Sequence, residues 1–98
     1  MHNVVVITPR ARQQLIAAST WWLDHRDKVP GAFEEDITRG LNTIAEHPLL
    51  GERVPEKPGV RRLFLRRIGY YLYYRIATGG TIQVLAVWHH SRGSAPTL

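Results

Sequence analysis

Three strand-like segments that follow one another in the second half of the chain limit its fold more than any other feature. They span Val60–Ile68, Tyr70–Ile76 and Thr81–Trp88, and they either alternate in polarity or are rich in β-branched and aromatic residues. Only Gly69 and the turn-forming segment Ala77–Gly80 separate them. Connections this short join strands that run antiparallel. The sequence therefore predicts an antiparallel meander.

Two helices are predicted before the meander. The first begins at Thr8 and Pro9, an N-cap followed by proline at the first helical position, and its apolar stripe continues to about Arg26. The second extends from Phe33 to His47 with apolar residues at helical spacing, and the proline that follows ends it. The short connection over residues 27–31 makes the two helices an antiparallel hairpin.

A β-branched run at Asn3–Thr8 adds one strand before the helices. The predicted order is β-α-α-β-β-β, an α+β fold in which the helix hairpin packs on one face of a four-stranded, mainly antiparallel sheet. We expect one domain over residues 1–98, since a chain of this length builds a single core. Pro48–Gly59 holds three Pro and two Gly and is predicted to be a loop.

Composition excludes several classes of protein. The chain has no Cys, which rules out disulfides, thiolate metal ligands and a cysteine nucleophile. Its hydrophobic fraction of 44% is sufficient for a packed core. No apolar run approaches the length of about 20 residues that a membrane-spanning helix requires. We expect a soluble, cytoplasmic protein that binds no metal and no other cofactor.

Positive charge is confined to the end of the chain. Residues 1–58 carry seven Lys or Arg and eight Asp or Glu, whereas residues 59–98 carry six Arg and no acid. Arginine pairs bidentately with carboxylates and phosphates. The second segment therefore predicts a polyanionic partner, either nucleic acid or an acidic protein segment. A solvated basic face is the alternative interpretation.

Alternation assigns the meander residues to two faces of the sheet. Leu72, Tyr74 and Ile76 are predicted to form the core set of their strand, which leaves Tyr71 and Tyr73 on the opposite face. The helix hairpin can cover only one of these faces. We therefore expect the face with Tyr71 and Tyr73 to remain uncovered.

The last strand is apolar on both faces, with a predicted division of Ile82, Val84, Ala86 and Trp88 against Leu85 and Val87. The polar tail from Ser91 is expected to fray and to cover nothing. An uncovered aromatic face flanked by arginines is typical of a partner-binding surface. On this interpretation Arg62, Arg67 and Arg75 pair with the carboxylates of an acidic segment. Alternatively, the aromatic rings lie flat under the arginine side chains.

Four segments occur in an order and spacing that resemble a known family. They are His47–Gly51, Gly59–Arg62, Tyr70–Ile76 and Val84–Arg92, and the strand leading into Thr8 and Pro9 precedes them. Over nearly the whole chain they resemble the RelE/ParE superfamily of bacterial type II toxins, and the ParE-like branch most closely. The resemblance implies a growth-inhibiting toxin, as found in plasmid stabilisation, and a cognate antitoxin whose acidic segment folds on binding.

The two branches of this superfamily imply different targets. Toxins of the ParE-like branch inhibit DNA gyrase, whereas toxins of the RelE-like branch are ribosome-dependent endonucleases that cut mRNA. RNA cleavage without a metal needs a base, an acid and cations around the phosphate. His89 and His90 are the candidate acid and base, and Arg62 and Arg92 are candidates to hold the phosphate.

Residue chemistry favours gyrase inhibition over mRNA cleavage. Neighbours on a strand point to opposite faces, so only one of His89 and His90 is expected to address a given site. Nuclease relatives often carry Arg where Tyr71 falls, and Tyr or Lys near Ser91. A terminal His-x-x-Arg is common in the ParE-like branch, which makes His90 and Arg92 the candidate target-binding residues. We therefore expect a toxin that acts by binding rather than as an enzyme.

A small basic nucleic-acid-binding module is a further alternative. Such a module would need an element that fits a groove of the nucleic acid. No predicted helix is basic along one face.

Overall fold

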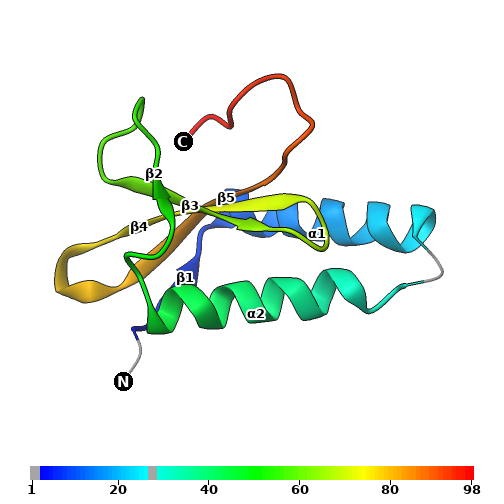
Figure 1. Ribbon diagram of the computed structural model, residues 1–98, viewed down its shortest axis with the longest axis horizontal. Helices are drawn as coiled ribbons and strands as arrows, with labels where there is room; N and C mark the ends of the chain where they lie inside the picture. Colours follow the sequence, from blue (N-terminus) through cyan, green and yellow to red (C-terminus); the bar gives the residue numbers. More distant parts are fainter. Residues whose placement is uncertain (1–2, 27–28) are drawn as a thin grey trace.

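The computed structural model describes residues 3–26 and 29–98, which form a mixed sheet of five strands with two helices packed on one face (Figure 1). The elements are β1 (Val5–Ile7), α1 (Pro9–His25), α2 (Ala32–Glu46), β2 (Glu52–Arg53), β3 (Val60–Leu65), β4 (Tyr70–Ile76) and β5 (Ile82–His89). The strand order is β1-β5-β4-β3-β2. The pair β1 and β5 is parallel and the other pairs are antiparallel. Helix α1 packs mainly on β5, and α2 packs on β3.

The predicted order of helices and strands is confirmed. Thr8 accepts a hydrogen bond from the backbone N–H of Ala11 at 3.3 Å, and Pro9 opens α1 as the sequence indicates. The predicted strand Val60–Ile68 ends early, at Leu65, because the N–H of Gly69 donates to the carbonyl of Leu65 at 2.8 Å and closes a turn. Residues 1–2 of the predicted domain and residues 27–28 of the predicted helix connection lie outside the described residues.

The prediction of four strands is wrong by one, because the segment expected to be a loop contains β2. This two-residue strand pairs Glu52 with Arg62 and Arg53 with Arg61. It carries no apolar alternation, and it lies between prolines in the sequence. A cross-strand ion pair accompanies this pairing, in which Nε of Arg62 donates to Oε1 of Glu52 at 2.5 Å.

The main core lies between the helices and the sheet. Its largest fully buried side chains are Tyr74, Phe33, Ile44, Leu72, Ile82 and Val84. The hydroxyl of Tyr74 donates to the carbonyl of Pro48 at 2.7 Å and accepts from the N–H of Gly51 at 2.9 Å. A Cβ on Gly51 would lie 2.5 Å from the same hydroxyl oxygen. The segment that leaves α2 is therefore bound to the centre of the sheet.

A β-bulge overturns the predicted division of β5. Tyr73 pairs with Ala86 and Tyr74 pairs with Val84, so Leu85 is an extra residue opposite β4. One extra residue in a strand moves each side chain that follows it to the opposite face of the sheet. Ile82 and Val84 pack in the core under the helices, as does Val87. Leu85, Ala86 and Trp88 belong to the cluster on the opposite face.

Ile76 is a further correction to the predicted core set. Its side chain is 39% exposed, because it ends β4 beyond the helices and lines an open groove with Leu49 and Arg61. Leu72 and Tyr74 are buried as predicted.

The C-terminal tail packs on the second face of the sheet, so the expectation that this face is uncovered and that the tail frays is wrong (Figure 1). The indole N–H of Trp88 donates to the carbonyl of Ser94 at 2.7 Å, and the guanidinium of Arg10 donates to the carbonyl of Thr97 at 2.7 Å. Pro96 is buried, and Leu98 packs against a small core around Tyr73. Apolar side chains at the end of the tail make this packing favourable.

Replacing Gly51 is expected to destabilise the fold. Gly51→Ala places a methyl group against the hydroxyl of Tyr74, and this overpacking should lower the free energy of unfolding by about 1–3 kcal/mol. Urea unfolding followed by circular dichroism measures the change. Gly93→Ala is the matched control, since no atom lies within 4 Å of the added Cβ. Equal stability of the two variants would contradict the prediction.

Candidate functional site: an arginine–aromatic face and the end of β5

Neither a membrane span nor a metal centre is present in the described part of the chain. Within residues 3–26 and 29–98, no helix is long and apolar enough to cross a membrane. Across the same residues, no three His, Asp or Glu side chains gather as metal ligands would. Most of the residues predicted for partner and target binding lie on the second face of the sheet and at the end of β5.

Arg62 is the centre of a cluster on the second face. Its guanidinium lies over the ring of Tyr71, 4.3 Å from the ring centroid, and donates to the hydroxyl of Tyr73 at 3.2 Å. The hydrogen bond that Arg62 donates to Tyr73, with the hydrogen bond to Glu52 and the charge of that carboxylate, raises the pKa of Arg62 above its ordinary value. Arg62 is therefore a fixed cation whose charge Glu52 already balances in part.

The structure brings together only some of the predicted antitoxin-binding residues. Tyr71 is half-buried beside Arg62, and Tyr73 is 3% exposed beneath the tail. Arg75 is exposed on the same face and donates to Gln83 at 2.6 Å. Arg67 is apart from this group, in the turn between β3 and β4, where it pairs with Glu35 of α2 at 3.5 Å.

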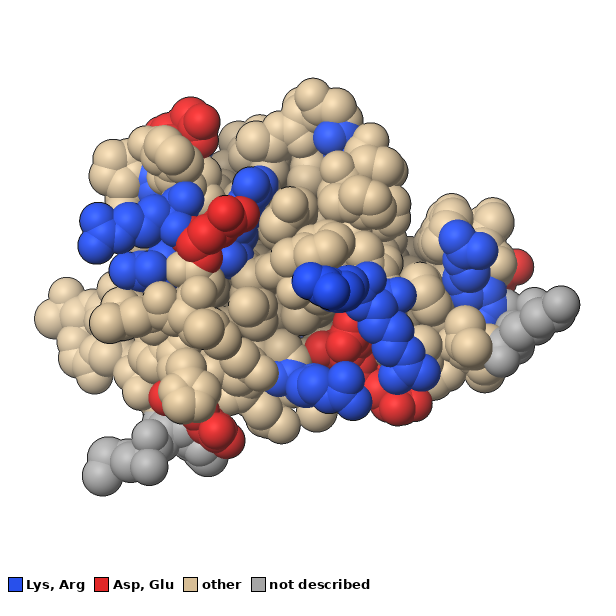
Figure 2. All heavy atoms as spheres, in the orientation of Figure 1, with Lys and Arg blue, Asp and Glu red and all other residues tan. Residues whose placement is uncertain are grey.

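Figure 2 shows how the basic side chains are distributed on one face of the molecule. One group covers β2 and the adjoining end of β3, and a second lies by the β3–β4 turn and α2, with acidic atoms beside both. The ion pairs Arg62–Glu52 and Arg67–Glu35 account for part of this mixing. The Arg-rich half of the sequence therefore does not fold into one uniform basic surface.

His89 and His90 lie side by side at the end of β5, although a continuous strand would separate them. Their ring centroids are 4.6 Å apart, with an angle of 39° between the planes. The strand ends at His89 and the chain turns at His90, which removes the alternation on which the prediction depended. Each ring nevertheless packs on a different neighbour, His89 on Tyr70 and His90 on Phe64, so the expectation that only one of them addresses a given site stays a prediction.

Backbone contacts determine the tautomer of each imidazole. Nδ1 of His90 lies 2.9 Å from the carbonyl of Gly69, so it carries the proton and leaves Nε2 unprotonated in the neutral ring. Nδ1 of His89 accepts the N–H of Ser91 at 3.2 Å, so Nε2 carries its proton. Burial, followed by the nearby charges of His90 and Arg92, lowers the pKa of His89 below 6.5.

Two residues that the sequence analysis did not single out position this end of β5. Gly69 has a φ of +76°, which L residues with a side chain rarely adopt, and its carbonyl orients His90. Trp88 supports Arg92, whose guanidinium lies 4.2 Å from the centroid of a ring of the indole. For Gly69, the available signal in the sequence was a glycine between two predicted strands. The bulge removed the signal for the second, because it changed the face on which Trp88 lies.

Comparison with known proteins gives the family. Residues 5–93 match the family model described as the ParE toxin of the parDE type II toxin–antitoxin system. The chain belongs to the ParE toxin family. A solved structure described as a chromosomal ParDE TA system from P. aeruginosa superposes with a TM-score of 0.72 at 25% identity, over 90% of this chain and 96% of that chain. No curated protein matches the sequence.

The resemblance to ParE-like toxins is thereby confirmed, and the protein is the toxin of a type II toxin–antitoxin system. A toxin of this kind has a cognate antitoxin as its partner. Apart from Arg67, the residues predicted for partner and target binding lie on two surfaces, the end of β5 and the arginine–aromatic face formed by Arg62, Tyr71, Tyr73 and Arg75.

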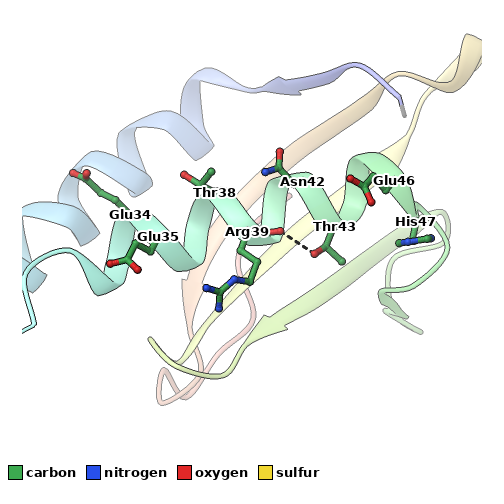
Figure 3. A pocket seen from close by; sticks show the side chains of 8 residues that line it. All are labelled: Glu34, Glu35, Thr38, Arg39, Asn42, Thr43, Glu46 and His47. Carbon is green, nitrogen blue, oxygen red and sulfur yellow. Dashed lines mark hydrogen bonds between the residues drawn. The ribbon is translucent and has the colours of Figure 1, made fainter. Parts of the chain in front are cut away.

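A third surface of the ParE toxin runs along the outer side of α2 (Figure 3). A shallow hollow of about 740 Å³ is lined by Glu34, Glu35, Thr38, Arg39, Asn42, Thr43, Glu46 and His47. Its charges are mixed, and among the side chains drawn the marked interaction is the hydroxyl of Thr43 donating to the carbonyl of Arg39 at 2.8 Å. None of the predicted site residues lines it.

The pKa of His89 should respond to Arg92. Arg92→Gln removes a positive charge close to the imidazole, so the lowered pKa of His89 is expected to rise towards 6.5. Titration of the ring protons by NMR measures the change, and Arg12→Gln on the exposed start of α1 is the control. The pKa of His89 is lower in the folded protein than in the unfolded chain. Its contribution to the free energy of unfolding is therefore complete above about pH 6.5 and declines as the pH falls below that value. An unchanged pKa in Arg92→Gln would contradict the prediction.

Proposed function

We propose that this ParE toxin acts by binding and inhibiting DNA gyrase, and that His90 and Arg92 contact the target. The observation that supports this most directly is that His90 and Arg92 are each held in position at the end of β5. There the Gly69 carbonyl orients His90 and the Trp88 ring supports Arg92, while Arg92 remains exposed. Arginines held in place in this way are frequent hot spots of protein interfaces.

The surroundings of the other candidate residues support binding over RNA cleavage. Tyr71, at the position where nuclease relatives often carry Arg, is stacked under Arg62. Ser91, near the position where they carry Tyr or Lys, is bonded to the ring of His89. Arg62 is paired with Glu52 rather than free to hold a phosphate. We therefore propose no catalytic role for these residues.

We further propose that an acidic segment of the cognate antitoxin binds the arginine–aromatic face. Arg62, Tyr71, Tyr73 and Arg75 lie on one face of the sheet, and Arg67 lies in the β3–β4 turn. A segment that contacts all five residues has to pass around this turn. It also has to displace the tail from Tyr73, which the tail covers.

The affinity of the antitoxin should depend on salt. Exposed charge pairs are screened, so raising the ionic strength from about 0.05 M to about 0.5 M is expected to weaken the complex. Arg75→Gln and Arg67→Gln should each weaken binding by about two- to five-fold and reduce the salt dependence. Isothermal titration of the toxin with its antitoxin measures both effects. Arg26→Gln, at the far end of α1, is the matched control. An affinity that is insensitive to salt would count against this surface.

Two alanine variants distinguish gyrase inhibition from mRNA cleavage. Arg92→Ala is expected to reduce toxicity strongly, whereas His90→Ala should leave most of it, since one imidazole contributes only part of a binding surface. Expression of each variant is followed by growth, mRNA integrity and DNA supercoiling, with Arg12→Ala as the control. The proposal would be overturned if the toxin cleaved mRNA and left supercoiling normal, and if His90→Ala lowered the rate of this cleavage by about 10²–10⁴-fold. That result would favour acid–base catalysis.

A further inference from the structure

A hollow of about 480 Å³ lies between α1 and the end of β5, on the side of the sheet that the helices cover. Ala17 and Ala18 of α1 and Val87 of β5 contribute apolar walls. Small-molecule sites typically have volumes of about 300–1,000 Å³ with largely apolar linings. The hollow is therefore large enough for one compact ligand, and it is separate from the arginine–aromatic face.

The polar groups that line this hollow are mainly hydrogen-bond donors. Gln14 uses its Oε1 to accept the N–H of Val87 at 2.9 Å, which leaves its amide NH₂ to donate. The Nδ1 of His89 accepts from Ser91, so its Nε2–H is the group left to donate. Arg92 can only donate. No Asp or Glu lines the hollow, so nothing in it repels an anion.

Tyr70, His89 and Arg92 line the hollow where it reaches the end of β5. The ring of Tyr70 packs edge-on against that of His89, with 4.9 Å between the ring centroids. The ring of Trp88 holds Arg92 in place at 4.2 Å. Within the described part of the chain, no ion pair involves Arg92. This end of the hollow is therefore a preformed positive site that lacks a carboxylate.

An aromatic wall adjoins this positive site. Trp21 lines the hollow from α1 and is 44% exposed. Its ring stacks on His25, with 4.3 Å between centroids and 9° between planes. An exposed, supported aromatic ring is a platform on which any nucleobase can stack.

We propose that this hollow binds a nucleoside phosphate, with the base against Trp21 and the phosphate at His89 and Arg92. A phosphate fits better than a carboxylate, because it offers three strong acceptor oxygens to donors that come from several side chains. The aromatic wall and apolar floor match the flat body of a nucleoside rather than an extended acidic chain. The phosphate chemistry is the same in a free nucleotide and at the end of a nucleic-acid strand.

Titration of the full chain with AMP, GMP, CMP and UMP tests the proposal by calorimetry. We expect at least one nucleotide to bind with a dissociation constant below about 1 mM. Arg92→Gln should weaken binding by at least about ten-fold, since it removes a charge-assisted hydrogen bond. Trp21→Leu should weaken it by about ten-fold through loss of stacking. Arg12→Gln, which removes the same charge from α1 outside the hollow, should bind as the unmodified chain does.

Several results would overturn the proposal. The first is that no nucleotide binds saturably at concentrations below about 10 mM. The second is that neither Trp21→Leu nor Arg92→Gln changes the binding. The third is that inorganic phosphate binds as tightly as the nucleotides. Tighter Arg92-dependent binding of a short poly-glutamate peptide would overturn it in favour of an acidic protein segment. A 5′-phosphorylated RNA oligomer that binds more tightly than the mononucleotides would support the proposal and identify a strand end as the source, whereas equal affinity would identify the free nucleotide. Because only the toxin and small ligands are present, the outcome does not depend on whether gyrase is the target.

Discussion

The buried hydroxyl of Tyr74 links the two halves of this toxin. It bonds to Pro48 and Gly51 in the segment that leaves α2, and it does so from the centre of the sheet, where burial raises the pKa of the phenol. An unpaired hydroxyl in this position would be costly, so the segment has one favourable path. That path starts β2 at Glu52 and places its carboxylate against Arg62. The partial neutralisation of Arg62 by Glu52 on the arginine–aromatic face therefore depends on the hydrogen bonds of the buried Tyr74 hydroxyl.

The second constraint is the single extra residue in β5. The bulge at Leu85 moves Trp88 to the face opposite the helices, where its indole binds the tail through Ser94 and its ring supports Arg92. Without the bulge, Trp88 would continue the alternation of Val84 towards the helices. One irregularity thus positions both the tail that covers the second face and the cation that we propose for target binding.

Prediction from the sequence succeeded where local periodicity determines the outcome. The bounds of β4 agree with the predicted Tyr70–Ile76, and Thr8 and Pro9 start α1 as expected. It failed for β2, whose two residues have no period of their own. It also did not foresee the contact between the rings of His89 and His90, which forms where the strand ends. The candidate site residues stay predictions, and the sequence did not indicate how they group in space, as the separation of Arg67 from Arg62 shows.

The sequence by itself determined the types and order of the main elements, the absence of thiol chemistry and the likeness to ParE-like toxins. These properties are visible locally, because a helix or a strand repeats its pattern over a few neighbouring residues. The tertiary structure decided which cations are neutralised and which face stays open. Those outcomes rest on contacts such as Arg10 with Thr97, which join residues 87 positions apart. No short-range pattern encodes such a contact, since it forms only after the sheet register and the bulge have placed both partners.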